Sequence, residues 1–128
     1  MSYYFSKTIN ESLEKAKERV TETLKEEGFG ILTEIDVQAT LKKKLDVDFR
    51  PYIILGACNP AFAYEALKSE QNIGTMLPCN VILQENKKGS IEVSAVDPVA
   101  SMQAIKNDQL GKVATEVRNK LQRVIEKL

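Results

Sequence analysis

Two kinds of hydrophobic spacing alternate along the chain. Short runs of aromatic and β-branched residues predict strands at residues 3–9, 31–35, 53–58, 81–83 and 91–93. Elsewhere apolar residues recur three and four positions apart, which predicts helices at about residues 11–27, 36–45, 60–67, 98–105 and 110–128. The order βαβαβαββαα fills residues 1–128 without a linker or repeat. It predicts one α+β domain, in which helices pack against a sheet.

The last predicted helix carries the clearest pattern. Its apolar residues form one stripe over about five turns: Leu110, Val113, Ala114, Val117, Leu121, Val124, Ile125 and Leu128. In a domain this small, such a stripe is expected to leave apolar surface uncovered. The pattern therefore favours a two-fold homodimer.

Residues typical of helix ends support these boundaries. Four good capping side chains precede predicted helices: Asn10, Asp36, Asn59 and Asp97. Gly28 follows the first helix, where a left-handed residue is favoured. The lysine run 42–44 lies between the apolar positions Val37, Leu41 and Leu45, and it is expected to be a solvated helix face.

The charge balance and the missing histidine narrow the classes of function. With 18 basic and 18 acidic residues, the chain has no electrostatic footprint for nucleic acid or an anionic membrane. The absence of histidine rules out Ser-His-Asp and Cys-His activation within the chain, and zinc sites that use histidine. No glycine-rich phosphate loop is present. Neither a cofactor nor an enzymatic reaction is identified by these features.

The chain has no pattern typical of secretion or membrane insertion. Residues 1–9 lack the long apolar segment of a signal peptide, and no apolar stretch approaches the roughly 18–20 residues that cross a bilayer. The sequence therefore predicts a cytoplasmic protein with reduced thiols.

The strongest candidate for a reactive site is the segment Cys58-Asn59-Pro60, which follows the apolar run 53–55. Asn59 and Pro60 are typical of a helix start, so Cys58 is expected between the end of a strand and the beginning of a helix. Backbone N–H groups and the helix dipole favour a thiolate there. Cys58 is thus the candidate nucleophile, and it is predicted to be the more reactive of the two thiols.

The second cysteine, Cys79, stands at the start of the fourth strand, and its distance from Cys58 depends on topology. Parallel third and fourth strands would hold the thiols roughly 15 Å or more apart. Antiparallel strands would bring Cys58, Cys79 and Asp97 to one end of the sheet, near two helix starts, as a site for an anion, a thiolate or a metal. Alternatively, both cysteines are packing residues, and Asn59 and Asp97 are only helix caps. Without paired CxxC spacing, the zinc signature is weak.

Several segments together resemble the domain of unknown function 302 family. They are Glu34-Ile-Asp-Val, Leu41-Lys-Lys-Lys, Arg50-Pro-Tyr, Leu55-Gly-Ala-Cys-Asn-Pro, Leu77-Pro-Cys-Asn-Val and Asp97-Pro. The resemblance covers nearly the whole chain. It implies a curved, mainly antiparallel sheet of about five strands in an architecture like that of the TATA-binding protein, and it implies a homodimer. It therefore favours the antiparallel alternative, but it assigns no catalytic residue.

Three hypotheses about function follow. In the first, Cys58, Asn59, Cys79 and Asp97 form a site for a small anionic or sulfur-containing ligand, with Cys58 as the reacting thiol. In the second, Cys58, Cys79 and nearby carboxylates bind a metal ion. In the third, the chain is a structural or protein-interaction module and both thiols are inert.

Overall fold

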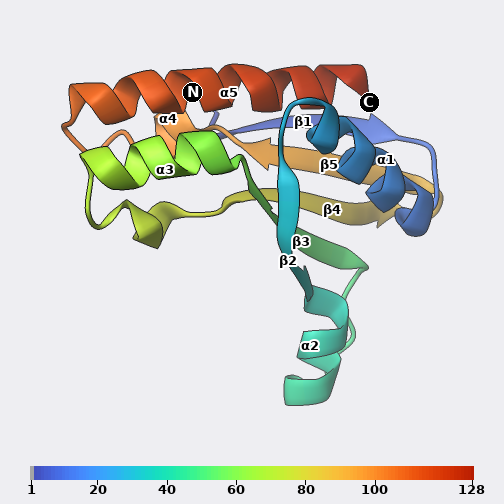
Figure 1. The fold of residues 1–128 in the computed structure, drawn as a ribbon. Helices are drawn as coiled ribbons and strands as arrows, with labels where there is room; N and C mark the ends of the chain where they lie inside the picture. The colour runs from blue at the N-terminus through green and yellow to red at the C-terminus, as the bar shows by residue number, and fades with distance from the viewer. Residues whose placement is uncertain (1) are drawn as a thin grey trace.

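The computed structural model describes residues 2–128 and shows two layers, a sheet and a set of helices over one of its faces (Figure 1). The strands are β1 (Tyr4–Ile9), β2 (Gly30–Asp36), β3 (Tyr52–Cys58), β4 (Cys79–Lys87) and β5 (Ser90–Val96). The helices are α1 (Leu13–Glu26), α2 (Val37–Leu45), α3 (Pro60–Ser69), α4 (Pro98–Ser101) and α5 (Asp108–Lys127). A 3-10 helix, η1 (Ile73–Met76), lies in a segment that the sequence predicted as a loop.

The sheet has the order β1-β5-β4-β3-β2, and every pair of neighbours is antiparallel. β1 and β2 are the edge strands, so the sheet is open, and it is not strongly curled (Figure 1). These observations confirm the α+β class and the predicted element order. They also decide the question that the sequence left open, because β3 and β4 run antiparallel.

The core lies between the sheet and helices α1 and α5. Alternate residues of the central strands face these helices and are buried: Leu55, Ala57, Val81, Leu83, Val93 and Ala95. From α1, Ala16, Val20 and Leu24 meet them, as the helical spacing predicted. Such alternation is typical of a sheet with one covered face.

The apolar stripe of α5 is buried within its own chain. Leu110, Ala114, Val117, Leu121, Val124 and Ile125 all lie in the core. The expectation that this stripe leaves apolar surface uncovered is therefore wrong, because the sheet and α1 cover most of it, and α3 and η1 cover its first turns at Leu110 and Ala114. The homodimer itself stays a prediction.

Helix ends differ in detail from the prediction. Asn10 does not cap α1; the helix begins later, and the Ser12 hydroxyl accepts a hydrogen bond from Lys15 N at 3.2 Å. At the other end, Gly28 has a φ of 89°, and its N–H donates to Lys25 O, as a left-handed C-terminal residue should. Helix α4 stops at Ser101, before the predicted end at about residue 105.

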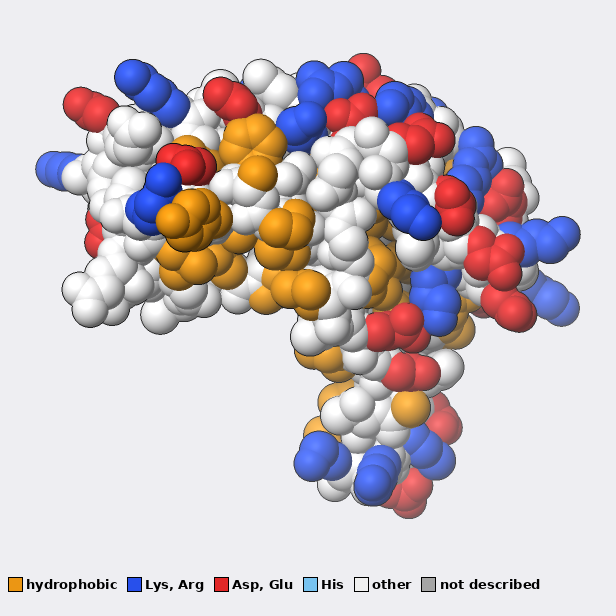
Figure 2. All heavy atoms as spheres, viewed as in Figure 1, with side chains coloured by type: hydrophobic (Ala, Val, Ile, Leu, Met, Phe, Trp, Pro, Cys, Tyr) orange, Lys and Arg blue, Asp and Glu red, His pale blue; other side chains and the backbone are white. Residues whose placement is uncertain are grey.

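One segment stands away from the rest of the molecule. Residues 36–50, here called the arm, contain α2 and project beyond β3 (Figures 1 and 2). No residue of α2 is buried, and Leu45 is 66% exposed. The apolar positions predicted for this helix therefore do not form a core face, whereas the lysine run is solvated as expected. None of the helices in residues 2–128 is long and apolar enough to cross a membrane.

Candidate functional site

The two cysteines meet at one end of the sheet. The ladder between β3 and β4 pairs Ala57 with Cys79, so Cys58 lies one position beyond that pair. β5 ends at Val96 beside the start of β4, which places Asp97 at the same end. The geometry predicted for antiparallel strands is thus the one observed.

A cavity of about 280 Å³ opens at this end, between the sheet and helices α3 and α5. Both cysteines line it, together with apolar side chains such as Phe62, Leu110 and Val117. Among the described residues that line the cavity, Asn59 alone has a strongly polar side chain, and none is charged. The space suits an apolar group and offers no cation to hold an anion.

The environments of the two thiols differ. Cys79 is buried, and burial raises the pKa of its thiol from 9.0 to about 11, with a smaller contribution from Cys58. Cys79 therefore remains protonated and unreactive near neutral pH. Cys58 is only half-buried, and no disulfide joins the two. Cys58 is thus the accessible thiol of the cavity, with Cys79 as part of its wall.

Asn59 occupies the N-cap position of α3, but its side chain makes no capping hydrogen bond. Its Nδ2 instead donates to the carbonyl oxygen of Glu27 at 3.2 Å, which ties the start of α3 to the end of α1. A Cβ added at Gly28 would lie 3.0 Å from Nδ2, so a larger residue there would press on the Asn59 amide. The capping role predicted for Asn59 is therefore wrong, although the residue does line the cavity.

Asp97 has other partners and does not line the cavity. Its Oδ1 accepts hydrogen bonds from Val99 N at 3.0 Å and Ala100 N at 3.4 Å, so it caps α4 as predicted. Its Oδ2 pairs with Arg118 Nε at 3.2 Å. Within residues 2–128, no group of three or more Cys, Asp or Glu side chains is placed to hold a metal ion. The carboxylate that the metal hypothesis needed is engaged in these structural contacts.

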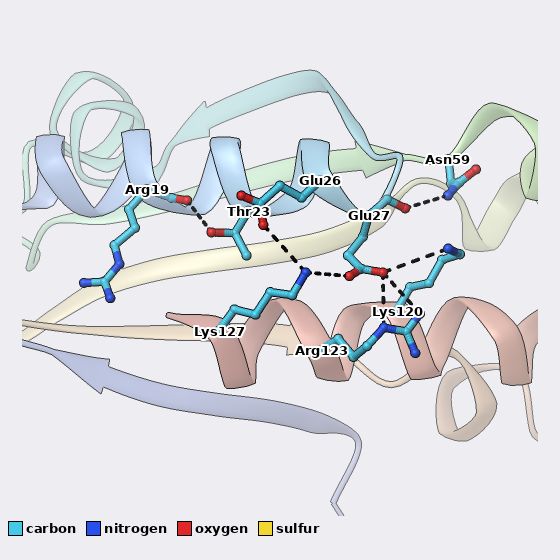
Figure 3. A network of polar contacts seen from close by, with 8 residues as sticks. All are labelled: Arg19, Thr23, Glu26, Glu27, Asn59, Lys120, Arg123 and Lys127. Carbon is cyan, nitrogen blue, oxygen red and sulfur yellow. Dashed lines mark hydrogen bonds and ion pairs between the residues drawn. The ribbon is translucent and has the colours of Figure 1, made fainter.

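Sequence reasoning missed the polar cluster beside the cavity, which is centred on Glu27 (Figure 3). The Glu27 carboxylate accepts hydrogen bonds from Lys127 Nζ at 2.8 Å and Arg123 Nη2 at 3.1 Å, and Lys120 Nζ lies 3.9 Å away. These contacts, with Lys127 first, lower the pKa of Glu27 below 4.5. The sequence feature that could have indicated this cluster is the row of basic residues in the last helix, Lys120, Arg123 and Lys127. Lys120 also lies over the ring of Phe62, so the cluster braces one wall of the cavity.

Comparisons with known proteins place the chain in a family. The family model described as "Domain of unknown function DUF302" matches residues 5–128. A search of the curated proteins gave no match. Among solved structures, the chain is similar to an uncharacterized conserved DUF302 protein from Bacillus stearothermophilus, with 25% identity and a TM-score of 0.91. The alignment covers 99% of this chain and 98% of that one. The chain belongs to the DUF302 family.

Proposed function

We propose that the chain binds a small, mainly apolar or sulfur-containing molecule in the cavity at the Cys58 end of the sheet. The observation that carries this proposal is the lining: two thiols and apolar side chains enclose about 280 Å³. That volume is close to the lower end of the range for ligand pockets, so the ligand is small. Since the described lining holds no charged residue, apolar burial and contact with the thiols supply the affinity.

Cys58 is the thiol placed to react with a disulfide ligand: its sulfur would attack one sulfur of the ligand, form a mixed disulfide and release the other half as a thiol. It lies at the cavity wall and is partly accessible, whereas the raised pKa of Cys79 keeps that thiol protonated. The helix α3 begins two residues after Cys58, so this thiol lies beside the start of a helix. The proposal thus keeps thiol chemistry at Cys58 and gives Cys79 a packing role.

Binding is tested with 1-hexanethiol and 1-hexanol as probes, by the melting temperature of the protein. A ligand at ten times its dissociation constant stabilises the folded state by about 1.4 kcal/mol. Ala63→Leu narrows the cavity and should abolish the shift. Ala61→Leu is the matched control, because Ala61 is an exposed residue of the same helix that does not line the cavity. If neither probe stabilises the wild type, the binding proposal is wrong.

Thiol reactivity is tested by alkylation with iodoacetamide between pH 5 and pH 9, followed by peptide mass mapping. Cys58 should be labelled in the folded protein, and Cys79 only after unfolding. Bound 1-hexanethiol should slow labelling of Cys58, and Cys58→Ser should leave no labelled site in the folded state. If both thiols react only after unfolding, the chain is better described as a structural or protein-interaction module.

A further inference from the structure

The thiol cavity runs along one end of the sheet, from the edge strand β2 to the end of β5. Its lining takes one residue from each step of this path: Leu32 of β2, Cys58 of β3, Cys79 of β4 and Pro98 directly after β5. Exposure falls in the same direction, because Leu32 is 65% exposed, Cys58 is half-buried, and Cys79 and Pro98 are buried. Cys58 therefore lies between an open end and a closed end of one apolar cavity.

The open end is apolar on both sides. Leu67 of α3 lines the cavity from the helix side and is 47% exposed. Tyr64, which is 63% exposed, lies one turn earlier on the same side of α3. We call Leu32, Tyr64 and Leu67 the mouth strip, and Figure 2 shows hydrophobic side chains gathered beside α3 and towards β2. An apolar group can therefore extend from the cavity onto the surface and keep apolar contacts.

The closed end removes an apolar group from water more completely. Met102 and Leu110, which are 9% and 2% exposed, line the cavity there. They belong to a second hydrophobic cluster, separate from the main core that contains Cys79. The cavity lies between the two clusters, so a group that fills it contacts both. Each methylene buried there should favour binding about threefold to fourfold.

From this gradient, and resting on the function proposed above, we infer that the ligand is a disulfide with an apolar group on each sulfur, whose inner half Cys58 keeps and whose outer half it releases. The inner half occupies the closed end, and the outer half lies on the mouth strip. The Cys58 thiolate attacks the sulfur of the inner half, so a new S–S bond forms as the ligand's own S–S bond breaks. The electron pair goes to the outer sulfur, which takes a proton from water and leaves as a thiol. One disulfide replaces another, so the step needs no oxidant or reductant.

The surroundings of Cys79 make the mixed disulfide at Cys58 long-lived. Exchange requires a thiolate, and burial raises the pKa of the Cys79 thiol to about 11. Cys79 is therefore a poor nucleophile for displacing the inner half and closing a disulfide within the chain. The reaction that must follow is a second exchange, in which a thiol from solution attacks the mixed disulfide and takes the inner half away.

Hexyl 2-hydroxyethyl disulfide tests which half is kept, because one of its halves is apolar and the other polar. The protein is incubated with it, quenched in acid and mapped by peptide mass. At Cys58, the ratio of hexyl to hydroxyethyl adduct should exceed that in the urea-unfolded chain about tenfold or more. Ala63→Leu, which narrows the cavity, should return the ratio towards the unfolded value, whereas Ala61→Leu on the exposed side of α3 should not. Equal ratios in the folded and unfolded wild type overturn the inference.

Dibutyl disulfide tests the mouth strip, because its outer half is apolar. Leu32→Ser should slow its reaction with Cys58 about threefold or more, and it should leave the reaction of butyl 2-hydroxyethyl disulfide unchanged. Leu45→Ser is the matched control, since Leu45 is 66% exposed but lies on the arm, away from the cavity. Equal rates for Leu32→Ser and Leu45→Ser overturn the assignment of the outer half. A folded protein that forms no adduct at Cys58 overturns the whole inference, while a melting temperature raised by 1-hexanol would leave the binding proposal standing.

Discussion

Helices α5 and α2 begin alike in sequence and end in opposite surroundings. Both carry apolar residues at helical spacing, and both have a side-chain N-cap: Asn107 accepts from Leu110 N at 3.1 Å, and Asp36 accepts from Ala39 N at 2.9 Å. Yet α5 buries six residues against the sheet and the neighbouring helices, whereas α2 buries none. The comparison shows that periodicity predicts a helix and its apolar face, but not whether another element covers that face.

Different forces hold the two helices. Burial of a leucine side chain contributes about 1.5–3 kcal/mol, and α5 gains such a term repeatedly. The nine-residue α2 depends on local contacts: its Asp36 cap, the left-handed Asp46 whose N–H donates to Lys42 O, and ion pairs of Lys42 with Asp46 and Asp48. Exposed pairs of this kind contribute about 0–1 kcal/mol. The arm is therefore expected to open at much lower free energy than the body.

The largest expected difference comes from one substitution made in each helix. Leu121→Ala removes a fully buried side chain and should lower the free energy of unfolding by about 2–5 kcal/mol. Leu45→Ala makes the same chemical change at a side chain that is 66% exposed, and its cost should stay below about 0.5 kcal/mol. Urea denaturation of both variants measures this. Similar losses would mean that α2 is covered in solution.

A smaller effect is expected from the ion cluster that joins α1 to α5. Because its basic partners lower the pKa of Glu27, this carboxylate stabilises the fold above pH 4.5. That contribution is lost as the pH falls through the lowered pKa. Glu27→Gln should cost about 1 kcal/mol at pH 7, and its difference from wild type should shrink between pH 5 and pH 3. Urea midpoints across this range measure the difference; a pH-independent gap would assign the loss to packing.

The smallest effect is expected from the ion pairs of the arm. Lys42→Ala breaks the contacts with Asp46 and Asp48, whose side chains are 88% and 97% exposed. The global free energy of unfolding should change by less than about 0.5 kcal/mol, while amide exchange within α2 becomes faster. Raising the salt concentration should speed exchange in the wild-type arm but hardly in the variant. A global loss as large as that of Glu27→Gln would show that the arm and body unfold together.

The site shows which features can be predicted from residues that are close together in the sequence and which cannot. The strand that ends at Cys58, the helix start at Pro60 and the cap at Asp97 were predictable, because each depends on a few adjacent residues. The true role of Asn59 was not, since its partner, the Glu27 carbonyl, comes from a turn 32 residues away. The cluster around Glu27 joins residues up to 100 positions apart. The sequence therefore shows the basic row in α5 but not that Glu27 is its partner.

By itself, the sequence determined the helices, the strands and their order, because hydrophobic period, capping residues and turn glycines act over a few neighbouring positions. The antiparallel sheet order, the cavity between Cys58 and α5, and the raised pKa of Cys79 were decided only by the tertiary structure. The same holds for the burial of α5 and the exposure of α2. The physical reason is that burial and desolvation depend on which distant segments come to lie together, and the sequence of a helix does not show which segments will cover it.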